Sequence, residues 1–108
     1  MSRRATAALL LLTGLTCTPA QAETAADCAA FWRGVAAEQR ALPGLGVAPD
    51  EAETLAAAFE ALPEAGPVAT DRIAGYRLLY RGLIAGDRQS TDLFSRIAER
   101  CDALLPRP

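Results

Sequence analysis

The stretch TAADCAAFWRGVAAEQRAL, residues 24–42, predicts the first helix of a folded domain. Thr24 is followed three residues later by Asp27, a spacing that resembles the capping box of a helix start, with Asp in place of Glu. One stripe of this helix then carries Cys28, Phe31, Val35 and Leu42. Because helical neighbours point about 100° apart, only one of Phe31 and Trp32 can face a core, and the other lies at its edge or is exposed, where it could anchor a partner. Such a stripe is what a small helical bundle buries.

Proline and glycine divide the rest of the chain into three more helical segments. The breakers lie at residues 43–46, 63–67, 86–90 and at the two C-terminal prolines. The expected helices start near Pro49, run from about Thr70 to Ala85, and run from about Thr91 to Leu105, with Ser90 and Thr91 as caps of the last. Each repeats a narrow apolar stripe, such as Ile73, Tyr76, Tyr80 and Leu83. No segment alternates apolar and polar residues as a half-buried strand would.

Residues 1–22 predict a secretory signal peptide. Two arginines are followed by an uncharged run over residues 5–15, a proline and the small-residue site Ala20-Gln21-Ala22. The apolar run is about half of the roughly 20 residues that a membrane-spanning helix requires. We therefore expect cleavage after Ala22, and a single helical domain of residues 23–108 that is periplasmic or secreted and is not inserted in the membrane.

The cysteines predict one structural disulfide. Cys17 lies in the leader, where Gly14 and Thr16 do not match the residues that a lipoprotein signal requires. Cys28 and Cys101 remain, and an even pair in an oxidising compartment normally closes. In an antiparallel bundle with an even number of helices, both lie at the same end. The sequence thus predicts an all-α, antiparallel four-helix bundle with one disulfide, which contributes about 4 kcal/mol on the chain-entropy model.

Composition excludes several classes of function. The net charge of −2 becomes −4 when the two leader arginines are removed, so neither nucleic acid nor an anionic membrane is an expected partner. The chain has no histidine, no Gly-X-Ser-X-Gly elbow, no phosphate loop and no haem motif. We therefore expect no cofactor, no metal and no catalytic residue. A bundle of this size also leaves little room for a cleft of about 300 Å³.

Two surfaces of the third predicted helix are candidate binding sites. Gly75, Gly82 and Gly86 fall close together on a helical wheel, and they are flanked by Leu78 and Leu79. This face predicts a smooth contact surface for a protein partner or a second copy of the chain, although a helix crossing within the bundle gives the same pattern. An anion site between the last two helices is the second candidate, formed by Arg77, Arg81, Arg96 and Arg100.

The carboxylates of the second predicted helix and the arginines of the third allow two interpretations. They form either a bipolar surface for a charged partner or complementary faces of neighbouring helices. Taken together, the sequence favours an exported, non-enzymatic binding or accessory protein of the bacterial cell envelope. The alternatives are a periplasmic chaperone of the acid-stress type, and an enzyme of unfamiliar kind that uses carboxylates and tyrosine.

Overall fold

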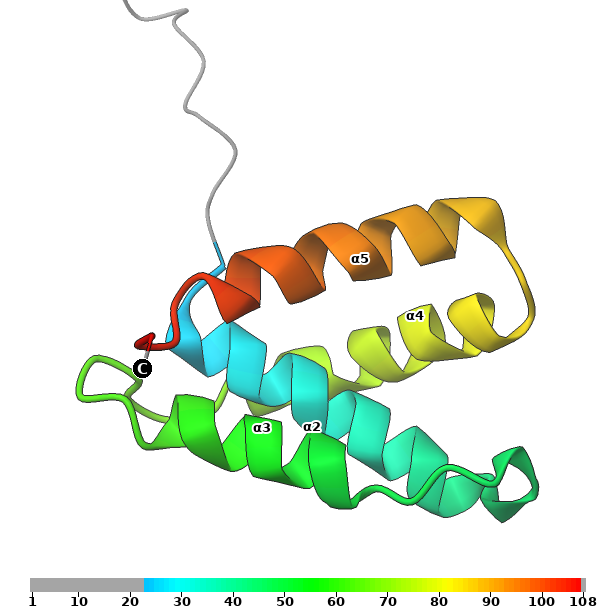
Figure 1. Ribbon diagram of the computed structural model, residues 1–108, viewed down its shortest axis with the longest axis horizontal. Helices are drawn as coiled ribbons and strands as arrows, with labels where there is room; N and C mark the ends of the chain where they lie inside the picture. The colour runs from blue at the N-terminus through cyan, green and yellow to red at the C-terminus, as the bar shows by residue number, and fades with distance from the viewer. Residues whose placement is uncertain (1–22, 108) are drawn as a thin grey trace, which may run out of the picture.

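The computed structural model describes residues 23–107, and this part of the chain is all-helical, with four α-helices and no strand. The helices are α2 (Ala25–Ala41), α3 (Asp50–Glu60), α4 (Ile73–Ile84) and α5 (Arg88–Asp102), with 3₁₀ turns at Pro43–Leu45 and Thr70–Arg72. Successive helices run in opposite directions (Figure 1). The predicted bundle is confirmed, whereas the predicted signal peptide and Cys17 lie outside the described residues.

Helix α2 is the centre of the fold. Among the helices of residues 23–107, α3 contacts α2 alone, whereas α4 packs on both α2 and α5. Ten of the 17 residues of α2 are buried, and four of them are alanines that let neighbouring helices approach closely: Ala25, Ala29, Ala30 and Ala36. Helix α2 is thus buried over much more than the narrow stripe that its large side chains predict.

Capping residues define the helix ends. The capping box of Thr24 and Asp27 is present as predicted. The cap of α5 differs from the prediction, because its N-cap is Asp87, whose carboxylate accepts a hydrogen bond from the backbone N–H of Ser90. Helix α5 therefore begins at Arg88, three residues before the expected start. Gly86, with φ of 80°, ends α4 in the left-handed conformation that glycine adopts readily.

Aromatic rings and the disulfide join the helices in the core. Phe31 is fully buried, and its ring contacts Trp32, Tyr76 and Phe94 at centroid distances of 5.0, 5.3 and 4.8 Å. Trp32 is only partly buried, as expected from its place beside Phe31. The predicted disulfide between Cys28 and Cys101 links α2 to α5, with the two Cα atoms 5.6 Å apart.

The complementary charges lie on different helices from those predicted. Since α3 does not contact α4 within the described chain, the carboxylates of α3 do not face the arginines of α4. Two carboxylates of α3 pair instead with α2, where Arg33 binds Glu60 at 2.7 Å and Arg40 binds Glu53 at 2.8 Å. The interpretation of α3 and α4 as facing, oppositely charged helices is therefore wrong.

Candidate functional site

A hollow of about 510 Å³ lies between α4 and α5, close to the end of the bundle that holds the disulfide. This α4–α5 hollow has an apolar wall and a polar rim, formed by Leu79, Leu93, Ile97, Glu23, Asp71 and Arg72, with Gly75 and Tyr76 completing it. A Cβ atom at Gly75 would meet no other atom within 4 Å, so the missing side chain adds to the open space. The expectation that the bundle leaves little room for such a cleft is wrong.

Tyr76 is the buried polar residue of this hollow. Its side chain is 5% exposed, and its hydroxyl has no hydrogen-bond partner among residues 23–107. The Cβ atom of Tyr76 lies against Gly34 of α2, and the guanidinium of Arg72 lies 5.1 Å from the centre of the ring. Burial raises the pKa of Tyr76 to about 12. The hydroxyl therefore keeps its proton at neutral pH and is a hydrogen-bond donor without an acceptor, an uncommon arrangement in a folded protein.

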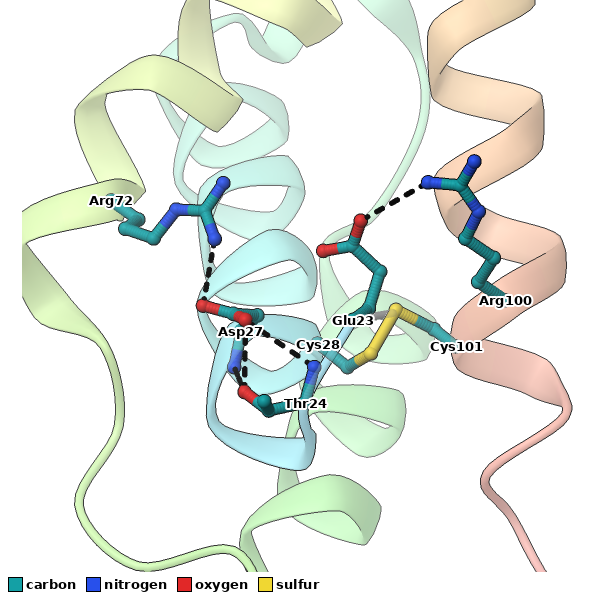
Figure 2. A network of polar contacts seen from close by, with 7 residues as sticks. All are labelled: Glu23, Thr24, Asp27, Cys28, Arg72, Arg100 and Cys101. Atoms are coloured by element: carbon teal, nitrogen blue, oxygen red, sulfur yellow. Dashed lines mark hydrogen bonds and ion pairs between the residues drawn. A yellow bond between two sulfur atoms is a disulfide. The ribbon is translucent and has the colours of Figure 1, made fainter. Parts of the chain in front are cut away.

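A network of polar contacts fixes the chain beside the hollow (Figure 2). The Nη1 atom of Arg72 donates to Asp27 at 2.8 Å, and Arg100 reaches Glu23 at 3.5 Å next to the disulfide. Burial acts to raise the pKa of Asp27, but hydrogen bonds from Thr24 and Arg72 outweigh it and hold the pKa below its ordinary value. Asp27 is therefore ionised at neutral pH, and it holds Arg72 over the edge of the hollow.

The three glycines of the predicted contact face have three different surroundings. Gly75 borders the hollow, Gly86 ends α4, and Gly82 is covered by Ser90 of α5, since a Cβ at Gly82 would lie 2.7 Å from the Cβ of Ser90. The expectation of one continuous groove for a partner is wrong, because the chain itself fills the position at Gly82. Of the flanking leucines, Leu79 packs against the core and Leu78 is 63% exposed. A partner at Leu78 stays a prediction.

Three of the four predicted anion-binding arginines bind carboxylates of the chain itself. The Nε atoms of Arg77 and Arg81 donate to Glu38 at 2.6 and 2.9 Å, while Arg100 binds Glu23. Three of the four arginines thus reach two separate carboxylates, and Arg96 lies exposed on α5. An external anion at this place stays a prediction.

Glu38 is the residue that sequence reasoning missed. Its side chain is only 1% exposed, and the hydrogen bonds from Arg81 and Arg77 outweigh burial and hold its pKa below the ordinary value. The sequence does contain a pattern that indicates burial of Glu38. Residues 28, 31, 35, 38 and 42 follow one helical stripe, and Glu38 occupies its fourth position. A buried carboxylate on such a stripe requires a cation partner.

The function is inferred from the geometry of the site, because no known protein offers a match to reason from. No protein-family model, no curated protein and no solved structure matches the chain. Within residues 23–107, no group of three or more His, Cys, Asp or Glu side chains is arranged to hold a metal ion. None of the helices in that range is long and apolar enough to cross a membrane.

Proposed function

We propose that this protein is an exported, non-enzymatic binding protein of the cell envelope, and that the α4–α5 hollow holds its ligand. The observation that supports this most strongly is Tyr76, which lines a hollow of about 510 Å³ and whose buried hydroxyl has no partner in the described chain. Ligand sites in proteins are commonly apolar clefts of roughly 300–1,000 Å³ that contain a few polar groups. The hollow has this composition.

The lining residues indicate the chemistry of the ligand. Leu79, Leu93 and Ile97 offer an apolar wall, and protonated Tyr76 offers one hydrogen-bond donor. The rim carries charges of both signs, with Arg72 already bound to Asp27. A small, uncharged, mostly apolar molecule with an acceptor such as a carbonyl oxygen fits these groups.

Binding is favoured over catalysis by the state of Tyr76. A general acid or base works best when its pKa lies near the operating pH, whereas burial moves the pKa of Tyr76 upward to about 12. The same hydroxyl is well suited to donate a stable hydrogen bond. This favours a binding protein over an enzyme that uses carboxylates and tyrosine.

Binding of prodan, an uncharged fluorescent naphthalene with a carbonyl group, tests the proposal. We expect its emission to shift to the blue and increase saturably when the oxidised protein is added. Tyr76→Phe should weaken binding about fivefold, because one hydrogen bond in a buried site is worth about 1 kcal/mol. Gly75→Leu should abolish binding, since its side chain would fill the hollow.

A control variant tests the ligand site, and a mass measurement tests export. Leu78→Ser is the control, because Leu78 lies on α4 but does not line this hollow. Equal binding of prodan by Tyr76→Phe, Gly75→Leu and Leu78→Ser would refute the site. Export is tested separately by the intact mass of the protein in the cell envelope, which should correspond to a chain that begins at Glu23. A mass that retains residues 1–22 would refute export.

A further inference from the structure

A second, smaller hollow of about 260 Å³ is lined by residues of α2, α3, α4, α5 and the segment that leads into α3. Three aromatic rings line it, those of Trp32, Tyr80 and Phe94. The ring of Phe94 lies 6.2 Å from that of Trp32 and 5.9 Å from that of Tyr80, so the rings form one continuous cluster. This hollow shares no lining residue with the α4–α5 hollow.

Gln39 provides an unused hydrogen-bond acceptor in the same place. Its side-chain nitrogen donates to the hydroxyl of Tyr80 at 3.1 Å, and the amide oxygen lies on the other side of the group. Gln39 is 9% exposed, and its oxygen Oε1 has no hydrogen-bond partner in the described structure. A buried amide oxygen without a donor is costly, and a ligand that carries N–H groups would satisfy it.

The charge of the hollow is negative. Glu51 is the one ionisable carboxylate among the lining residues, and no lysine or arginine lines the hollow. Glu51 forms no ion pair within residues 23–107, whereas its neighbour on the same helix, Glu53, is bound to Arg40. A free carboxylate, a carbonyl acceptor and aromatic rings together are complementary to a cation, because aromatic faces attract positive charge.

We propose that this hollow binds a small organic ammonium ion, with the charged group held between Gln39 Oε1, the Glu51 carboxylate and the rings of Trp32, Tyr80 and Phe94. The N–H groups of the ammonium satisfy the amide oxygen, and its hydrocarbon part contacts the aromatic rings. An anion is excluded by Glu51, and an uncharged ligand lacks the attraction to both the carboxylate and the rings. The site is independent of the function proposed for the α4–α5 hollow.

Trp32 is the only tryptophan in the chain, so its fluorescence reports on this hollow directly. The probe is phenethylammonium chloride, titrated into the oxidised full chain at low ionic strength. Phenethyl alcohol has nearly the same shape without the charge, and sodium chloride controls for ionic strength. We expect a saturable change in the emission of Trp32 with the ammonium ion, and about tenfold weaker binding of the alcohol.

Glu51→Gln is the decisive variant. It should weaken ammonium binding about three- to fivefold, the effect expected for one partly exposed charge. Asp50→Asn makes the same change of charge one residue away, outside the lining, and should leave binding within about twofold of the unmodified protein. Gln39→Leu should also weaken ammonium binding, because it removes the amide oxygen while Trp32 remains in place as the reporter. Thermal melting checks that each variant is folded.

Three outcomes would overturn the proposal. The first is an emission of Trp32 that does not respond saturably to phenethylammonium. The second is equal binding of phenethyl alcohol, which would show an apolar hollow without recognition of charge. The third is an equal effect of Glu51→Gln and Asp50→Asn, which would show attraction to the overall charge of the helix rather than a site.

Discussion

Replacing Gly82 with alanine should destabilise the protein, whereas the same replacement at Gly75 should stabilise it. A Cβ at Gly82 would overlap the hydroxyl of Ser90 and lie 2.7 Å from its Cβ. Ser90 cannot move away freely, because its N–H and hydroxyl both bind Asp87, at 2.9 and 2.7 Å. The first turn of α5 must therefore shift. A Cβ at Gly75 would meet nothing within 4 Å.

The magnitudes follow from two opposing effects. Overpacking costs about 1–3 kcal/mol, and the gain in helix propensity from glycine to alanine is at most about 1 kcal/mol. We expect a net loss of up to about 2 kcal/mol for Gly82→Ala and a gain approaching 1 kcal/mol for Gly75→Ala. In a domain of this size, 1 kcal/mol shifts the melting temperature by about 4–8 °C. The two variants should therefore melt on opposite sides of the unmodified protein.

Thermal melting followed by far-ultraviolet circular dichroism measures the difference. Ser90→Gly removes the atoms that a Cβ at Gly82 would strike. The double variant should therefore show a favourable coupling of about 1–2 kcal/mol relative to the two single changes. A Gly82→Ala variant that melts at or above the unmodified protein, or a coupling near zero, would refute the close contact of α4 and α5 at this position.

Three other predictions concern the disulfide, acid and the exposed leucine. Reduction of Cys28–Cys101 should lower the free energy of unfolding by about 4 kcal/mol, and urea titration with and without reductant measures it. Arginine partners lower the pKa of Glu38 and Glu60, so their contribution to stability is complete above the ordinary value of 4.5 and is lost as the pH falls through the lower folded-state values. Urea midpoints measured against pH should therefore fall only below that value, and less steeply in Glu38→Gln. If α4 is a contact surface, Leu78→Arg should abolish any self-association seen by sedimentation without changing the melt.

The helices are predictable from the sequence because their limits depend on neighbouring residues, and the disulfide is predictable as well. Helix ends follow from local capping and breaking, as with Thr24 and Asp27, and the expected limits differ from those observed by only a few residues. The predicted limits of the last helix differ most from those observed, because Asp87 competes with Ser90 and Thr91 for the N-cap and lies in a segment whose composition predicts a turn. Pairing of Cys28 with Cys101 follows from the number of cysteines outside the predicted leader.

Which helices are in contact, and where space remains between them, depends on the tertiary structure. Four of the buried residues of α2 are alanines, whose small side chains give no clear periodic signal, so the sequence did not show that α2 lies at the centre. The pairing of Glu38 with Arg77 and Arg81 joins residues 39 and 43 positions apart. The two hollows are regions that side chains from several helices fail to fill. Their existence depends on the packing of distant segments, which the spacing of residues along one helix does not specify.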